Sequence, residues 1–218
     1  MASNSTGSFS IFPPRDTTEF ALSVLKEKYG MEFQYLSPWN NSMGDTRRFL
    51  ASCDSMPGQK ILVSVENFRD KNARSVSDNV LACRYVQETE AFLRRCAEDT
   101  LGSGQVFYSP SMRVLPSSLP ADLSFERFLA DSGVLLPATI VLKASDFQTE
   151  DQALVLAQLI ADSGVSANLN FFAVPDELYG TLDLEQLKIK IAVNDFACFA
   201  SAVCRNGTVD LSFEEGTK

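Results

Sequence analysis

Along the first half of the chain, the spacing of apolar residues switches between the helical and the strand period, and this switching strongly constrains the fold. Apolar residues three or four positions apart predict a helix from Asp16 to Gly30 and a longer helix over 82–96. Alternation with polar residues predicts strands at 32–36, 47–53, 60–66 and 106–108. The expected order is helix, three strands, helix and strand, and the polar stretch 69–79 is expected to be a mobile, solvated loop.

The second half shows the same two periods. The expected elements are helices at 125–129 and 153–161 and strands at 138–142, 169–174, 188–191, 196–204 and 209–213. A capping box at Thr149 and Gln152 opens the second of these helices, and Asn206-Gly207 is typical of the tight turn in a hairpin. We therefore expect an αβαβ unit that ends in an antiparallel meander, and the fold class is α+β.

Charge is unevenly distributed along the 218 residues. Residues 1–119 contain 13 Lys and Arg against 13 Asp and Glu, net 13 − 13 = 0, whereas residues 120–218 contain 6 against 15, net 6 − 15 = −9. Pro116 and Pro120 interrupt any helix or central strand near this change. These features predict a flexible segment over 1–15, a first α+β domain over 16–115 and an acidic α+β domain over 120–218.

Histidine is absent from the sequence. Its absence removes Ser-His-Asp and Cys-His catalysis, His-ligated metal sites and the usual general base near neutral pH. The 5 cysteines include no Cys-x-x-Cys pair, so neither a zinc site nor a complete disulfide framework is indicated. We expect no cofactor and no metal. The net charge of −9 also disfavours nucleic acid as a partner. A non-enzymatic protein that binds another protein or a peptide is the function this composition favours.

Two Asp-Ser-Gly triplets, which begin at Asp131 and Asp162, supply an alternative. They resemble the paired Asp-Thr/Ser-Gly motifs of aspartic proteases, in which two carboxylates held close together share one proton. Both triplets follow a helical pattern, however, and a glycine just after a helix is typical of a left-handed cap. We therefore favour a capping role. A carboxylate-dependent hydrolase with Asp131 and Asp162 as its catalytic residues is the alternative.

Trp39, the only tryptophan, lies in a turn-rich segment between two predicted strands. With Tyr35 and Met43 it is the best candidate for an exposed binding patch, because aromatic anchors dominate many interfaces. The alternative is that Trp39 folds back onto the local core. Cys83 is expected on the exposed side of the helix over 82–96, with no group beside it that would activate a thiol.

No apolar run is long enough to predict a transmembrane helix. The polar N-terminus has neither the basic nor the apolar region of a secretory signal, which predicts a cytoplasmic protein. A lipid-anchored extracytoplasmic protein is the alternative, because a Ser- and Asn-rich spacer also follows the cysteine of bacterial lipoproteins.

One stretch of the sequence resembles a known group of proteins. Residues 25–33, which include Lys28-Tyr29-Gly30, are similar to the opening of small uncharacterised Firmicutes proteins, many of them exported or lipid-anchored. In these proteins a helix that ends in Lys-Tyr-Gly leads into a cystatin-like or PepSY-like sheet. The resemblance covers the first half of the chain at most and carries no catalytic residue. It implies a binding or regulatory domain from a Gram-positive bacterium.

Overall fold

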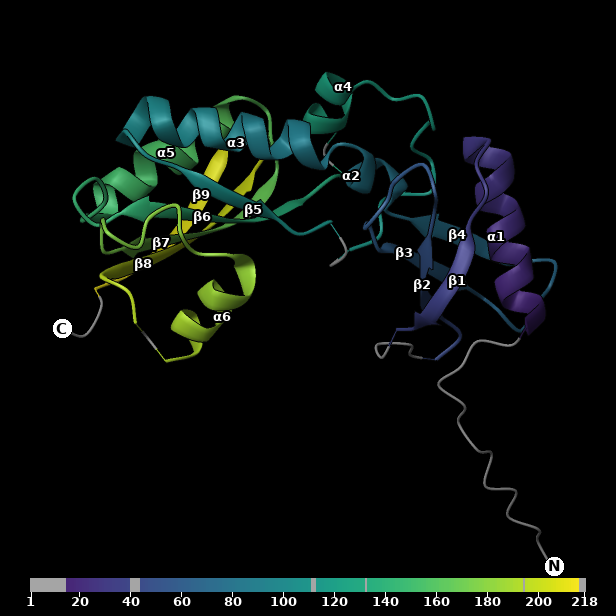
Figure 1. Ribbon diagram of the computed structural model, residues 1–218. Helices are drawn as coiled ribbons and strands as arrows, with labels where there is room; N and C mark the ends of the chain where they lie inside the picture. The colour runs from purple at the N-terminus through teal and green to yellow at the C-terminus, as the bar shows by residue number, and fades with distance from the viewer. Residues whose placement is uncertain (1–14, 40–43, 111–112, 132, 194, 216–218) are drawn as a thin grey trace, which may run out of the picture. The chain divides into compact units, whose positions relative to one another are not determined.

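The computed structural model describes residues 15–39, 44–110, 113–131, 133–193 and 195–215, which form two compact units (Figure 1). The first unit contains the chain up to Arg84 together with Arg113–Ala121, and the second contains the remainder from Tyr85 onwards. Each unit combines helices with its own β-sheet. The predicted α+β class is confirmed. Most of the predicted N-terminal segment 1–15 lies outside the described residues.

The first unit is built on a four-stranded antiparallel sheet with the strand order β1-β2-β3-β4. Its elements are α1 (Arg15–Tyr29), β1 (Gln34–Pro38), β2 (Arg47–Ser52), β3 (Ile61–Glu66), β4 (Ser75–Asp78) and α2 (Val80–Arg84). The helix and the three strands predicted here are confirmed.

The core of the first unit lies between α1 and one face of this sheet. Ala21 and Leu25, one turn apart on α1, are fully buried among alternate residues of β2 and β3. These strand residues are Phe49, Ala51, Ile61, Val63 and Val65. The apolar stripe of the helix therefore packs on the apolar face of the sheet, as the helical and strand periods predict.

The stretch 69–79 was expected to be a mobile loop, and for its second part that prediction is wrong. Ser75–Asp78 forms β4, which pairs with β3 from Val63↔Asp78 to Glu66↔Ser75. Only one apolar side chain, Val76, lies within this strand, so the sequence shows no alternation. The strand forms because β3 offers an edge and because Asp78 and Asn79 are buried with partners, as described below.

The predicted helix over 82–96 is two helices, α2 and α3 (Val86–Leu101), with Tyr85 between them. Tyr85 leaves the helical conformation, with φ −98° and ψ 24°. Its ring packs against Phe125 and Phe128, and its hydroxyl donates to the carbonyl of Leu123. The boundary between the two compact units falls at this break.

These units differ from the predicted domains 16–115 and 120–218. Gln105–Tyr108, predicted to close the first domain, forms β5 and pairs with β6 (Leu136–Lys143) in the second unit. α3 likewise packs against α5 (Glu150–Asp162) of that unit. The segment 113–121 instead belongs to the first unit, where the Leu115 N–H donates to the Asp78 carbonyl at 2.7 Å.

The second unit contains a five-stranded sheet with the order β5-β6-β7-β8-β9. Its remaining elements are α4 (Phe125–Ala130), β7 (Ala167–Val174), α6 (Leu184–Ala192), β8 (Cys198–Arg205) and β9 (Thr208–Glu215). β6 and β7 are parallel and the other neighbouring pairs are antiparallel, so the predicted meander is confirmed in β7, β8 and β9. α3 and α5 cover one face of the sheet and α6 covers the other (Figure 1).

Residues 188–191 were predicted to be a strand and instead lie within α6. A run of only four alternating polar and apolar residues is compatible with a helix as well as with a strand. Asp183 opens the helix with a capping box, because its carboxylate accepts from the Gln186 N–H and the Gln186 side chain accepts from the Asp183 N–H. Leu187 then packs onto the sheet against Val141 and Val174.

No helix in the described part of the chain is both long and apolar enough to span a membrane.

Candidate functional site

Of the residues predicted to form an aromatic patch, Tyr35 lies on β1, an edge strand of the first unit, and Trp39 directly follows this strand. Tyr35 is 37% exposed and its ring lies 5.6 Å from that of Phe49. Partial burial raises the pKa of the Tyr35 hydroxyl. Trp39 is half-buried, and its N–H donates to the Arg48 carbonyl at 3.0 Å, which holds the start of the following loop against β2. Met43 lies outside the described residues.

Leu36 belongs to this patch and was missed by the sequence analysis. The register runs from Tyr35↔Ala51 to Ser37↔Leu50, so Leu36 is an extra residue on β1. Such a bulge re-aims the side chain of the inserted residue. Leu36 is 48% exposed. No sequence pattern marks a bulge of this kind. In a regular strand, the side chains of Tyr35 and Leu36 would point to opposite faces of the sheet. Tyr35, Leu36 and Trp39 are called the β1 patch below.

Tryptophan fluorescence tests the position of Trp39 directly, because this is the only tryptophan in the chain. A half-buried indole should emit at a wavelength between those of a free and a fully buried indole. Acrylamide should quench it more slowly than it quenches free N-acetyltryptophanamide. Strongly blue-shifted emission without quenching would place Trp39 in the core and remove it from the β1 patch.

Asp131 and Asp162 lie at the ends of two successive helices, α4 and α5. The Asp131 carboxylate accepts from the Gly133 N–H at 2.8 Å, and the Asp162 carboxylate accepts from the Gln158 side chain at 2.7 Å. The strands that follow pair in parallel with Leu136 opposite Ala167, so the two triplets precede equivalent points of neighbouring strands. Each carboxylate thus has its own local partner at a helix end.

Gly164, which ends the second triplet, has a φ of +79°, the left-handed conformation that the capping interpretation predicts. Apart from Gly164 itself and its two chain neighbours, no heavy atom of the described residues lies within 4 Å of the position that a Cβ would occupy there. Gly164→Val should therefore destabilise the second unit by about 1–2 kcal/mol through backbone strain alone. Asp162→Asn is the matched control, because it leaves the backbone of the helix end unchanged and alters only the charge of an exposed side chain. It should change stability by less than about 0.5 kcal/mol in urea denaturation followed by circular dichroism. Equal effects of the two variants would contradict the cap.

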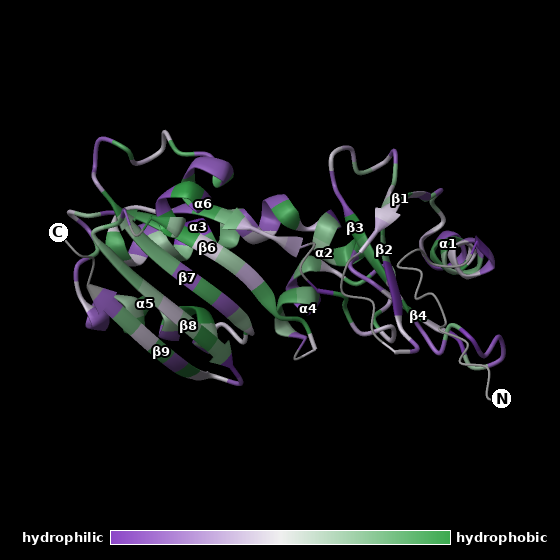
Figure 2. Ribbon diagram, turned by 90° about the horizontal axis from the view of Figure 1, so that it is seen from below, coloured by the Kyte–Doolittle hydropathy of each residue, from purple (hydrophilic) through white to green (hydrophobic). Residues whose placement is uncertain are grey.

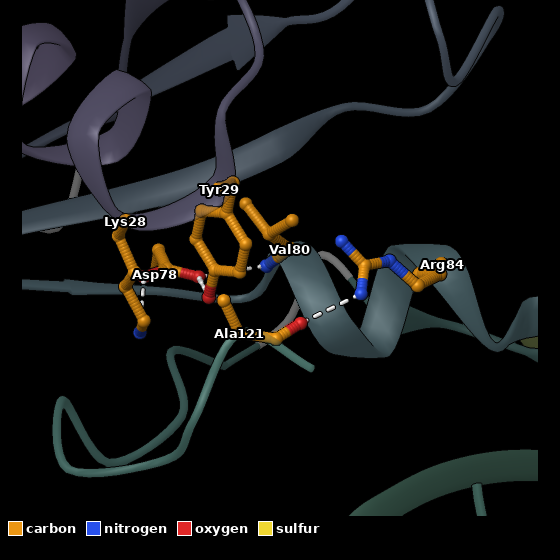
Figure 3. Close-up of polar contacts among 6 residues, drawn as sticks. All are labelled: Lys28, Tyr29, Asp78, Val80, Arg84 and Ala121. Atoms are coloured by element: carbon orange, nitrogen blue, oxygen red, sulfur yellow. Dashed lines mark hydrogen bonds and ion pairs between the residues drawn. The ribbon is translucent and has the colours of Figure 1, made fainter. Parts of the chain in front are cut away.

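A cluster that the sequence analysis missed surrounds Asp78, at the end of β4 (Figure 3). The side chain of Asp78 is only 2% exposed, and its carboxylate accepts from the Tyr29 hydroxyl at 2.7 Å and from the Val80 N–H at 2.9 Å. Lys28 forms an ion pair with its other oxygen at 3.2 Å. Asp78 therefore joins the end of α1 to β4 and to the start of α2.

The same cluster explains the Lys28-Tyr29-Gly30 sequence on which the resemblance rests. Lys28 and Tyr29 both reach Asp78, and Gly30 ends α1 at a φ of +67°. Burial and the neighbouring Asp78 charge raise the pKa of Tyr29, so its hydroxyl remains a hydrogen-bond donor. The one available signal was Asp78-Asn79 directly before an apolar run, which is typical of a helix start.

Cys83 is buried beside this cluster, not exposed as predicted, because it lies on the short helix α2. Burial, followed by the Asp78 charge, raises the pKa of its thiol to about 12. Burial also raises the pKa of Cys96, and raises that of Cys204 to about 11. Nucleophilic attack by cysteine requires the thiolate, so these three thiols are poorly suited to it at neutral pH.

Among the residues that the structure describes, no group of three or more Cys, Asp and Glu side chains could hold a metal ion. Comparisons with protein-family models, with curated proteins and with solved structures gave no match.

Proposed function

We propose that this chain is a non-enzymatic binding protein and that the β1 patch contacts a protein or peptide partner. The observation that carries the proposal is the exposed pair Tyr35 and Leu36 on an edge strand, at the position of a bulge. Large apolar side chains that lose water on binding are what an interface anchor requires. Trp39, at the end of the same strand, adds aromatic area.

The chemistry of the buried polar groups also supports a binding role. Asp78 has hydrogen-bond partners on both carboxylate oxygens, so it is not free to act as a base. Tyr29 and Cys83 have raised pKa values and stay protonated at neutral pH. This arrangement stabilises the first unit. An origin in a Gram-positive bacterium, as the resemblance implies, is part of the same proposal.

Affinity capture from a lysate of the native cells, with the full chain as bait, tests the proposal. Tyr35→Ser/Leu36→Ser should lose the captured partner, because it removes the apolar anchor. Ile189→Ser is the matched control, since Ile189 is an exposed aliphatic residue on α6 of the other unit. The purified partner should then shift the emission of Trp39 to shorter wavelength.

Two results would contradict this function. One is a set of captured proteins that does not change when the β1 patch is altered. The other is a proteolytic activity that Asp131→Asn/Asp162→Asn removes without unfolding the chain, which would establish the hydrolase instead.

A further inference from the structure

β9 is the terminal strand of the five-stranded sheet (Figure 2). β8 pairs with one side of its backbone over residues 208–215, and no strand in the described ranges pairs with the other side. The opposite edge of the sheet is different, because β5 is only 4 residues long and its Tyr108 N–H donates to the Glu90 carboxylate at 3.1 Å. A long edge that no described strand pairs with is a template for an added strand.

The register of the β8–β9 hairpin identifies which backbone groups of β9 face outward. Arg205 and Thr208 flank the two-residue turn, so they form a hydrogen-bonded pair, and such pairs alternate along an antiparallel ladder. The outward N–H and C=O groups therefore belong to Val209, Leu211 and Phe213. An added antiparallel strand would form its hydrogen bonds with these three residues.

On one face, the side chains of an added strand would lie beside α5. Val209 pairs with Cys204, whose thiol donates to the Ala157 carbonyl of α5, so this face of β9 lies under α5. Gln158 of α5 donates to the Gly207 carbonyl in the β8–β9 turn. Leu154, one helical turn earlier on the same side of α5, is 42% exposed. Strand residues opposite Val209, Leu211 and Phe213 would lie on the face of the sheet that α5 covers, which favours apolar side chains there.

On the other face, the same strand would meet carboxylates. Asp210 and Glu214 are exposed on that face, and no ion pair with a described residue occupies either of them. A second copy of β9 would bring like charges together, which is unfavourable across strands. Basic side chains would instead be attracted, in agreement with the net charge of −9 over residues 120–218.

We propose that the outer edge of β9 binds an extended segment of a partner protein in which basic and apolar residues alternate. The segment adds a strand to the second sheet. Its backbone provides the hydrogen bonds, its apolar residues face α5, and its basic residues face Asp210 and Glu214. This surface lies in the second unit, so the proposal goes beyond the β1 patch and does not depend on it.

The probe for this site is the labelled, end-capped peptide Lys-Val-Lys-Val-Lys-Val-Lys, followed by fluorescence anisotropy with the full chain. Asp210→Lys/Glu214→Lys should weaken its binding about tenfold or more, because two favourable cross-strand pairs become repulsive. Asp122→Lys/Glu177→Lys is the matched control, since it changes the net charge equally at two exposed acidic residues outside β9. It should change the affinity by about twofold at most. Leu36→Ser in the β1 patch should have no effect.

Amide hydrogen exchange provides an independent readout. Without peptide, the N–H groups of Val209, Leu211 and Phe213 should exchange faster than those of Asp210 and Ser212, which bond to β8. The peptide should slow the first group, and replacing its central valine with proline should abolish both the slowing and the binding. Equal weakening by the two charge-reversed variants, or unchanged exchange at these three amides, would show attraction to net charge alone and would overturn the proposal.

Discussion

Asp78→Ala is expected to lower the free energy of unfolding of the first unit by about 3 kcal/mol. The substitution leaves the Tyr29 hydroxyl and the Val80 N–H without their acceptor in a buried position. It also removes the ion-pair partner of Lys28, whose side chain is 21% exposed and is thus held away from water. The loss of several partners at one residue is what makes the effect large.

Urea denaturation monitored by Trp39 fluorescence measures this effect in the correct unit, because Trp39 belongs to the same unit as Asp78. Asp54→Ala, at an exposed acidic residue, is the control and should change stability by less than about 0.5 kcal/mol. Tyr29→Phe removes one of the hydrogen bonds and should cost about 1 kcal/mol. An effect of Asp78→Ala no larger than that of Asp54→Ala would mean that the cluster does not stabilise the unit.

Sequence patterns predict those elements in which a set of apolar residues recurs at the period of the element and faces one core. α1, β2 and β3 are of this kind. Leu25 of α1, Phe49 of β2 and Val63 of β3 each belong to such a set, and all three lie in the same core. Gly164 was predictable for a local reason, since a glycine just after a helix is typical of a left-handed cap.

The features that the sequence analysis missed depend on contacts between distant residues. Asp78 is buried only because Lys28 and Tyr29, about 50 positions earlier, supply its partners, and a buried carboxylate looks like a surface residue in the sequence. β5 was assigned to the first unit because its partner strand, β6, comes about 30 residues later. The bulge at Leu36 arises in the pairing of β1 with β2, which no local pattern shows.

Among the glycines of the second unit whose surroundings the structure describes, Gly104 is the one at which an added methyl group should have the largest effect. This glycine connects α3 to β5, and a Cβ on it would lie 2.6 Å from the Ala97 Cβ and 3.3 Å from the Arg94 carbonyl oxygen. Both groups belong to α3 and Ala97 is fully buried, so neither can move without displacing the helix. We expect Gly104→Ala to destabilise the unit by about 2–3 kcal/mol.

A double-mutant cycle separates this steric clash from other effects of removing a glycine. Ala97→Gly destabilises α3 by itself, but it also removes the atom that the new Cβ would meet. Ala97→Gly/Gly104→Ala should therefore be less destabilised than the sum of the two single variants, by about 1 kcal/mol or more. Gly180→Ala is the control for conformation alone, since Gly180 has a φ of +77° and open space around its Cβ position. It should cost about 1 kcal/mol in the same urea denaturation. Additive effects in the cycle would show that α3 and β5 do not approach each other as closely as the structure indicates.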